Sequence, residues 1–435
     1  MNVLVLTANF APRAASPAIR TVNLVKGLSA IDGVDVKVLT YDFETLTEFS
    51  GKDQSLIDKV PSEVSVERVK SGFLRAKIFK KKRNDQSATK SNDLKRRLIN
   101  NPLINFLIPD PHIESIYSFY KKACSLTVDW EPDVIISHAY PFSFHLLGHL
   151  VKKKYKKAKW IADYGDPWFG KPVAELKTPI WRNWIDSRLE RALLSNTDAV
   201  TLTTIPALKS YKNEYDFLED KLHVLPMGYD ADDMKEIAPI NLDKYYKFLE
   251  GKLLFVHTGR IYPEARDPLP FIEALDTLVT NCSFVAERIR VVIVGDVDGY
   301  MLSQVRNRPC EDLFTFVDWV PVRQSIAWMK TASLLLLFGN KGDSQIPGKV
   351  FQYLGTAKPI FFAQINPDDP TKDLLSDYKD CIICNNNKDQ LADSINDILN
   401  VNSSLIKSDK VDSPKCRDSY SWSNISLKLY EIIKS

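Results

Sequence analysis

The stretch Leu334–Phe362 reads LLLLFGNKGDSQIPGKVFQYLGTAKPIFF and alternates between two kinds of pattern. Leu334–Phe338 is an uninterrupted apolar run, which predicts a strand buried on both faces of a parallel sheet. A polar loop follows, and Pro347-Gly348 begins a helix, because proline fits the first helical turn. Pro359–Phe362 is again apolar and predicts the next strand. The stretch therefore predicts one strand–helix–strand unit of an α/β protein.

Similar apolar runs, separated by helix-length segments, recur along the whole chain. Strands that alternate with helices at this spacing predict two doubly wound domains, each with a parallel sheet. The twelve runs are Val3–Leu6, Val34–Leu39, Val134–Ile136, Trp160–Ala162, Val200–Thr203, His223–Leu225, Leu253–His257, Arg290–Val294, Thr315–Val317, Leu334–Phe338, Pro359–Phe362 and Ile382–Ile383.

The boundary between these domains is expected after the turn-forming sequence LPMGYD at residues 225–230. We expect one Rossmann-like domain over residues 1–235 and a second over residues 236–419. Two facing domains of this kind place a ligand cleft between them, at the carboxyl ends of their strands.

The net charge of +3 over 435 residues is unevenly spread. Residues 75–97 hold ten Lys or Arg against two Asp, and residues 152–159 (KKKYKKAK) hold six Lys. The composition excludes extensive disorder, and no apolar run is long enough to cross a membrane. The N-terminus lacks the pattern of a signal peptide, so the six cysteines are expected to be reduced thiols of a cytoplasmic protein.

Several common sites are disfavoured. His145 and His149 have the spacing of a zinc-binding helix, but no third ligand accompanies them. Cys381 and Cys384 lie in a strand-like run, where positions i and i+3 face opposite sides. The first strand is not followed by G-x-G-x-x-G, and neither a P-loop nor a G-x-S-x-G motif is present. We therefore expect no metal, NAD or FAD, and basic runs without interleaved aromatics disfavour nucleic acid.

Three places could carry chemistry. The helix start at Pro347-Gly348 offers free backbone amides, which bind anions such as phosphate, although an ordinary turn has the same sequence. The loop His257–Pro268 holds two arginines beyond a strand end, where they could grip phosphate. The loops after the first-domain strands, Phe10–Pro17, residues 137–141 and residues 162–168, are expected to open onto the same cleft.

These residues resemble a family, the GT-B-fold glycosyltransferases, and specifically glycosyltransferase family 4 of the bacterial polysaccharide and O-antigen type. The resemblance runs nearly end to end and in the family's order. Its segments are FAPRAASPAIR, EPDVIISHAYP, WIADYGDPW, SNTDAVTLTT with KLHVLPMGYD, HTGRIYPEARDP, IPGKVFQYLGTAKPI and SWSNISLKLYEII. It implies that the first domain binds the acceptor, that the second binds the donor, and that the helix at residues 420–435 packs back on the first.

The resemblance also implies roles for individual residues. Arg260 and Arg266 would hold the diphosphate of a nucleotide sugar, together with the backbone amides of Gly348 and Lys349. His138 would lie near the transferred sugar. The remaining expected positions are the loop Ala14, Ala15 and Ser16, which would close over the phosphates, Asp166, which would orient the acceptor, and Ser344, Gln345 and Gln352 on the donor side. Ser344 and Gln352 stand where many members have two glutamates.

The implied activity is metal-independent hexosyl transfer with retention, from a UDP- or GDP-linked sugar to a glycan acceptor that is lipid-linked. The alternatives are a sugar-nucleotide epimerase or phosphorylase, and a catalytically degenerate partner subunit. The basic and then apolar stretch at residues 75–107 suits an anionic membrane surface, so we expect a cytoplasmic protein that is peripheral on the inner face of the plasma membrane.

Overall fold

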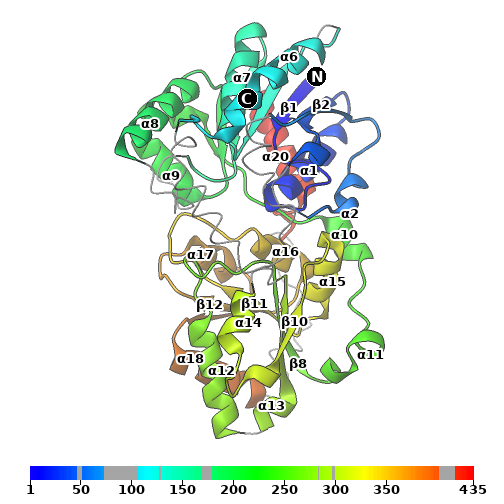
Figure 1. Cartoon of the computed structure of the whole chain (residues 1–435), viewed down its shortest axis with the longest axis vertical. Coiled ribbons are helices and arrows are strands. Elements are labelled where there is room, and N and C mark those ends of the chain that lie inside the picture. The colour runs from blue at the N-terminus through cyan, green and yellow to red at the C-terminus, as the bar shows by residue number, and fades with distance from the viewer. Residues whose placement is uncertain are drawn as a thin grey trace. The chain divides into compact units, whose positions relative to one another are not determined.

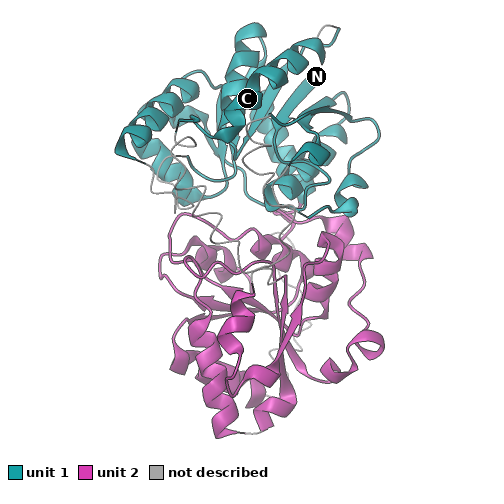
Figure 2. Cartoon of the chain, viewed as in Figure 1, with its two compact units in different colours: residues 1–227, 422–435 teal, residues 228–421 magenta. Residues whose placement is uncertain are grey.

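The computed structural model describes residues 1–46, 51–72, 106–126, 129–168, 179–282, 284–295, 299–400 and 417–435. Contacts divide the chain into two compact units (Figure 2). The first unit combines residues 1–227 with residues 422–435, and the second holds residues 228–421. Each unit has its own parallel sheet and its own hydrophobic core.

The described residues of the first unit form a seven-stranded sheet in the order β3-β2-β1-β4-β5-β6-β7. Figure 1 labels β1 and β2 of this sheet and the helices around it. Every pair of neighbouring strands is parallel. The strands are β1 Asn2–Thr7, β2 Asp35–Tyr41, β3 Ser65–Val69, β4 Val134–Ala139, β5 Lys159–Tyr164, β6 Ala199–Leu202 and β7 Leu222–Val224.

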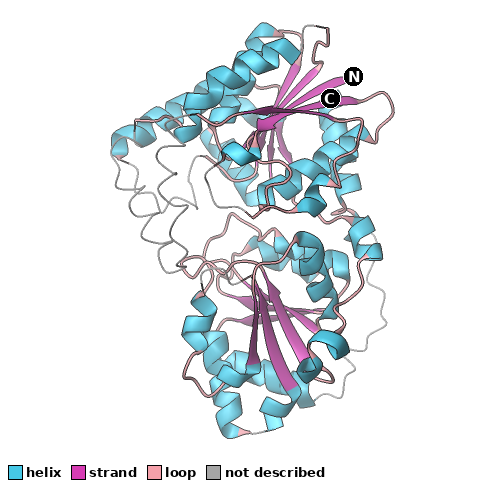
Figure 3. Ribbon diagram, turned by 45° about the vertical axis from the view of Figure 1, so that its right-hand side comes forward, coloured by secondary structure: helices cyan, strands magenta, loops and turns pink. Residues whose placement is uncertain are grey.

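Helices cover both faces of this sheet (Figure 3). Because successive strand residues face opposite sides, Leu4 and Leu6 pack with α6 to α9, whereas Val3 and Val5 pack with α1 and α20. The α-helices described in this unit are α1 Ser16–Ser29, α2 Gln54–Ile57, α6 Ile116–Leu126, α7 Ser143–Lys154, α8 Ile180–Leu194, α9 Ile205–Glu214 and α20 Trp422–Lys434.

The last helix belongs to the first unit although the whole second unit precedes it in the sequence. Ile425 and Leu429 of α20 share a core with Val22 and Val25 of α1. A Cβ at Gly27 would lie 2.4 Å from the Cβ of Ser426, so the two helices approach each other at a glycine. This close packing fixes α20 on α1.

The described residues of the second unit form a six-stranded parallel sheet in the order β10-β9-β8-β11-β12-β13. The strands are β8 Leu253–Thr258, β9 Ile289–Val294, β10 Phe314–Val317, β11 Leu334–Phe338, β12 Ile360–Gln364 and β13 Cys381–Asn385. The helices are α10 Ala231–Glu236, α11 Leu242–Tyr245, α12 Leu269–Asn281, α13 Phe284–Arg288, α14 Tyr300–Val305, α15 Val322–Thr331, α16 Lys349–Thr356, α17 Pro370–Ser376 and α18 Lys388–Asn400.

The prediction of two parallel-sheet domains is confirmed, and each of the twelve predicted runs overlaps a strand. The sequence pattern misses β3. Three of the five residues of its sequence SVERV are polar, because β3 lies at the edge of the sheet, where it pairs with β2. Edge strands need no continuous apolar run, so the pattern that finds buried strands does not find this one.

The first crossing between the units lies at Met227–Gly228, eight residues before the boundary predicted at residue 235. Helix α10 belongs to the second unit, because Arg323 of α15 donates to Asp233 at 3.0 Å and Lys330 donates to the carbonyl of Met234 at 3.0 Å. The turn chemistry at residues 225–230 therefore marks the crossing itself, and the polar stretch after it folds with the second unit.

Candidate functional site

The second unit gathers three cationic side chains near the carboxyl ends of its central strands. Arg260 and Arg266 lie in the loop between β8 and α12, and both guanidinium groups lie over the ring of Tyr262, at 5.4 and 5.9 Å. Lys349 is the first residue of α16. A Cβ on Gly259, which follows β8, would lie 3.4 Å from the Lys349 ammonium, so this ammonium lies against the end of β8. The loop and the helix start are thus brought together.

A chain of hydrogen bonds positions Arg266. Its Nε donates to Oδ1 of Asn340 at 2.8 Å, and the backbone amide of Asn340 donates to Asp369 at 2.6 Å. The Asn340 side chain also donates to the carbonyl of Gln345 at 2.8 Å, which ties down the loop after β11. Gly339 allows this approach, because a Cβ there would lie 3.1 Å from the Asp369 carboxylate.

His257 positions Lys349. Nδ1 of His257 lies 3.0 Å from the carbonyl of Leu336, and its Nε2 lies 2.9 Å from the Lys349 ammonium. Thr258, the next residue, donates its amide to the hydroxyl of Tyr353 on α16 at 3.1 Å. Strand β8 therefore holds α16 by two side chains, four residues apart on one face of the helix.

The electrostatics of this site follow from burial. Burial, and then the charge of Arg266, lowers the pKa of Lys349 well below its usual range. Burial also lowers the pKa of Arg266, and burial with the charge of Lys349 lowers the pKa of His257 well below its usual value. Among the described residues, neither Lys349 nor Arg266 has a carboxylate within ion-pair distance. Positive charge without a bound counter-charge favours an anionic ligand.

The other donor-side predictions lie around this cluster. Gly348 is the N-cap of α16 and provides no side-chain cap, while the amide of Val350 donates to the carbonyl of Pro347 at 3.0 Å. Ser344 and Gln345 lie in the partly buried loop before it, and Gln352 is partly buried on the helix. The sequence reading missed His257, Asn340 and the side chain of Lys349. Asn340 follows the end of β11, and this position is a signal that could have indicated it, whereas His257 lies within the apolar strand β8 and carries no such signal.

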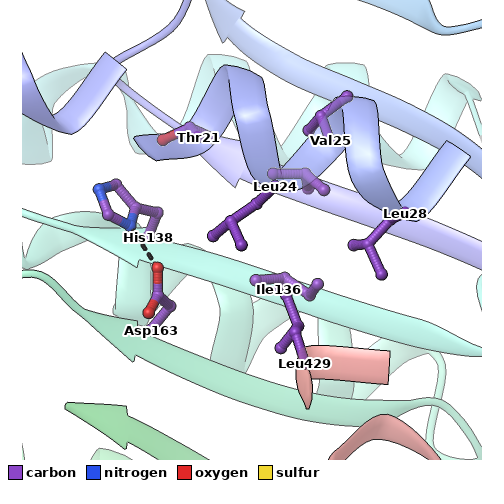
Figure 4. A pocket seen from close by; sticks show the side chains of 9 residues that line it. Thr21, Leu24, Val25, Leu28, Ile136, His138, Asp163 and Leu429 are labelled. Carbon is purple, nitrogen blue, oxygen red and sulfur yellow. Dashed lines mark hydrogen bonds and ion pairs between the residues drawn. The ribbon is translucent and has the colours of Figure 1, made fainter. Parts of the chain in front are cut away.

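The first unit holds a buried ionic cluster at the carboxyl ends of β4, β5 and β6. His138 and Asp163 are register partners on β4 and β5, and Asp163 pairs with Thr201 on β6. The Asp163 carboxylate lies 2.7 Å from His138 Nδ1 (Figure 4). It also accepts from Thr201 at 2.6 Å and from Arg20 at 2.7 and 3.1 Å. Burial raises the pKa of Asp163, but Arg20 and the hydrogen bonds outweigh it and hold this pKa well below its usual value.

The predicted catalytic histidine is therefore oriented by a carboxylate. An ionised Asp163 can only accept, so Nδ1 of His138 carries a proton. Nε2 of His138 is buried and has no hydrogen-bond partner among the described residues. The His138 side chain lines a small, mostly apolar cavity beneath α1, together with Asp163, Thr21 and Leu24 (Figure 4). Asp163 positions His138, which agrees with a structural role for the aspartate.

The remaining first-unit predictions lie in loops after strands. Asp166 follows β5 in a turn in which the amide of Gly165 donates to the carbonyl of Ala139 at 3.1 Å. Ala14 donates its amide to the carbonyl of Gly51 at 2.8 Å, and Ala15 is the N-cap of α1. Ser16, the first residue of that helix, is exposed. The structure does not place Asp166 in the His138 cluster.

The structure describes the two motifs at which the sequence disfavours a metal site, the histidine pair of α7 and the cysteine pair of β13. His145 lies 2.8 Å from the Ser137 hydroxyl, which also accepts from Trp160 at 2.9 Å, and burial lowers the pKa of His145 to about 3. Cys381 and Cys384 are free thiols. Where the structure describes the chain, three or more potential metal-ligating side chains do not cluster.

The predicted membrane-binding stretch lies outside the described residues, except for Phe106 and Leu107. Among the helices that are described, none combines the length and the apolar character needed to cross a bilayer.

Comparisons with solved structures identify the fold of the chain. No protein-family model and no curated protein matches the chain. The Anabaena protein HepE, solved in complex with UDP, is 13% identical with a TM-score of 0.65, and the match covers 100% of both chains. The two units together form the GT-B fold.

Two further structures match over the same length. The α,α-trehalose-phosphate synthase (UDP-forming) of Burkholderia xenovorans, solved with glucose-6-phosphate, is 12% identical with a TM-score of 0.66, over 100% of both chains. The sucrose-phosphate synthase of Thermosynechococcus elongatus is 12% identical with a TM-score of 0.64, over 100% of this chain and 98% of that one. At such identities the similarity establishes the GT-B fold alone.

Proposed function

We propose that this chain is a glycosyltransferase that transfers a hexose from a nucleotide diphospho-sugar. The observation that carries the proposal is the cluster of Arg260, Arg266 and Lys349 at the start of α16. Two guanidinium groups, an ammonium and the backbone amides of a helix start suit a diphosphate, which carries charge on both phosphates. The GT-B fold of the chain is consistent with this activity.

A uridine nucleotide is the donor that we favour. HepE was solved with UDP, and the trehalose-phosphate synthase is described as UDP-forming. GDP-linked sugars remain the other class to test, because the cationic cluster would grip the diphosphate of either nucleotide. Gln352 would bind the ribose through its amide, and Ser344 or Gln345 would contact the sugar.

The proposed mechanism retains the anomeric configuration and needs no resident metal. As the glycosidic bond breaks, the sugar becomes oxocarbenium-like and negative charge grows on the leaving diphosphate. Arg260, Arg266 and the start of α16 would stabilise that charge. The leaving phosphate would take the proton of the acceptor hydroxyl on the same face. His138 would contact the transferred sugar through Nε2, Asp166 would orient the acceptor, and the loop Ala14–Ser16 would close over the phosphates.

We further propose that the acceptor is a lipid-linked glycan of a polysaccharide, capsule or O-antigen pathway, as expected of a family 4 enzyme. The support is the sequence resemblance, together with the basic residues 75–97 that precede an apolar stretch. Such a stretch favours the anionic inner face of the plasma membrane. A cytoplasmic enzyme held there would meet its acceptor.

A catalytically degenerate subunit is the second candidate, because Ser344 and Gln352 replace carboxylates that the family uses. A chain of this kind would lack transfer activity. An epimerase or phosphorylase would instead convert a nucleotide sugar without a glycan acceptor.

The test of the proposed function is transfer. A panel of UDP- and GDP-sugars is first screened by thermal shift, and stabilising donors are then incubated with lipid-linked glycan acceptors. We expect an acceptor-dependent product whose new bond keeps the anomeric configuration of the donor, as read by proton NMR. Conversion without acceptor would instead favour an epimerase. Donor binding without any turnover would favour the degenerate subunit.

A further inference from the structure

The imidazole of His257 lies behind the cationic cluster of the second unit. His257 is the fifth residue of β8 and is only 1% exposed. Its Nδ1 lies 3.0 Å from the carbonyl of Leu336 on the neighbouring strand β11. A carbonyl oxygen can only accept, so Nδ1 carries the proton and donates it to Leu336. In the neutral imidazole, Nε2 then has a free lone pair.

The Lys349 ammonium meets that lone pair. Its Nζ lies 2.9 Å from Nε2, and an ammonium group can only donate. The hydrogen bonds therefore run in one direction, from Lys349 to His257 and from His257 to Leu336. A protonated imidazole could not accept from Lys349, so His257 accepts from an ammonium only in its neutral form. Burial favours the same neutral form, as it lowers the pKa of His257.

A neutral partner has a consequence that a carboxylate would not have. A carboxylate in the place of the imidazole would form an ion pair with Lys349 and would cancel the charge that an anion needs. His257 orients the ammonium and leaves its charge uncompensated. Arg266 likewise has a neutral hydrogen-bonding partner, the side chain of Asn340 at 2.8 Å. Both cations are thus fixed by neutral groups.

We propose that His257 is a positioning residue for the donor: as a neutral acceptor, it holds the Lys349 ammonium at the start of α16, where that ammonium binds the diphosphate of the nucleotide. This inference rests on the proposed function and adds to it the residue that orients the Lys349 side chain. His257 does not itself contact the nucleotide. It acts through Lys349, and its contribution should disappear when Lys349 is absent.

Two conservative substitutions separate the two hydrogen bonds of His257. In His257→Asn, the short amide can still reach Leu336 but not Lys349. In His257→Gln, the longer amide can place its oxygen near the position of Nε2 and accept from Lys349. Lys349→Met removes the ammonium and keeps the length of the side chain. Lys358→Met is the matched control, because Lys358 is also a partly buried lysine beside α16.

The experiment measures the affinity for UDP by calorimetry in these variants and in the double variant of His257→Asn with Lys349→Met. We expect His257→Asn to weaken binding about ten-fold, in keeping with the loss of a hydrogen bond to a charged group, and Lys349→Met to weaken it at least as much. The double variant should bind no more weakly than Lys349→Met alone. His257→Gln should recover most of the affinity, and Lys358→Met should bind like the parent.

Three results would overturn the inference. His257→Asn could bind UDP as the parent does, or its effect could add in full to that of Lys349→Met, which would indicate a general structural role. Nitrogen-15 NMR of the histidine side chains gives the third result without any nucleotide: a His257 that is cationic, or protonated on Nε2, at neutral pH would contradict the geometry. If the parent binds neither UDP nor GDP, the proposed function fails, whereas the other outcomes reject the role of His257 alone.

Discussion

Arg20 on α1 and Asp163 on β5 form a buried, two-pronged ion pair across 143 residues of sequence, with distances of 2.7 and 3.1 Å. Arg20 also donates to the carbonyls of Leu225 and Pro226, at 3.0 and 2.8 Å, just before the chain leaves the first unit. The Arg20 guanidinium therefore links α1 to the end of β5 and to the segment through which the chain leaves the first unit. The carboxylate that it holds also orients His138.

Loss of Arg20 should strongly destabilise the first unit. Arg20→Met leaves a buried carboxylate without its main counter-charge, and breaking a buried pair costs about 3–5 kcal/mol. The control is Arg308→Met, which removes a partly exposed pair with Asp276 and should cost about 1 kcal/mol or less. Amide hydrogen exchange on β5 measures the first unit by itself. Equal protection of β5 in the two variants would contradict this assignment.

Because the pKa of Asp163 is lowered in the folded chain, the stability of the first unit should depend on pH. The pKa of Asp163 is depressed in the folded chain, so its contribution to stability is complete above the pKa of the unfolded state, about 3.9, and is lost as the pH falls toward the folded value. Asp163→Asn lacks this contribution. The difference in unfolding free energy between parent and variant should thus be constant from about pH 5 to 7 and should shrink in stronger acid. A difference in unfolding free energy that grows as the pH falls would contradict the predicted direction of this dependence.

The sequence predicted the buried parts of the fold well and the polar connections poorly. Runs such as Leu334–Phe338 identify central strands because burial on both faces excludes polar residues, whereas β3 carries Glu67 and Arg68 at an exposed edge. The arginines of the β8 loop could be singled out because the motif HTGRIYPEARDP carries them. His257 could not, because a histidine inside an apolar strand has the pattern of a core residue, and only the fold brings Lys349 to it, 92 residues later.

A glycine on α16 should be essential for packing of the second unit. A Cβ on Gly355 would lie 2.6 Å from the ring of Tyr229, whereas a Cβ on Gly342 would meet nothing within 4 Å. We expect Gly355→Ala to destabilise the second unit by about 1–3 kcal/mol through overpacking. Gly342→Ala should change stability by less than about 0.5 kcal/mol. The measurement is urea unfolding of both variants, and equal midpoints would contradict the packing at α16.

The buried charge of Lys349 should lower the free energy of unfolding of the protein without bound nucleotide. Its pKa is depressed on folding, so the unfolded chain binds more protons between the two pKa values, and the penalty falls as the pH rises toward the unfolded value of about 10.4. Lys349→Met should therefore raise the melting temperature at pH 7, by an amount that decreases at alkaline pH. A lower melting temperature for Lys349→Met at pH 7 would contradict the burial of this charge.

Loss of the His138 side chain should slow transfer without weakening the binding of the donor. His138→Ala removes the group that we place against the transferred sugar and leaves the second unit unchanged. We expect the rate of transfer to fall about 10²-fold, a typical loss for one positioned catalytic group, with the affinity for UDP unchanged. Because Asp163 loses one partner, the melting temperature is measured beside the rate. Transfer at the parental rate would remove His138 from the mechanism.

Calorimetric titration of the full chain with UDP and with GDP, in the parent and in Arg266→Ala, tests the central claim most directly. We expect saturable binding of at least one nucleoside diphosphate, weakened by added salt and reduced about 10- to 100-fold in Arg266→Ala, because a charged hydrogen-bonding partner of the diphosphate is lost. An affinity that is unchanged in Arg266→Ala, or no binding of either nucleotide to the parent, would contradict a diphosphate site at the start of α16.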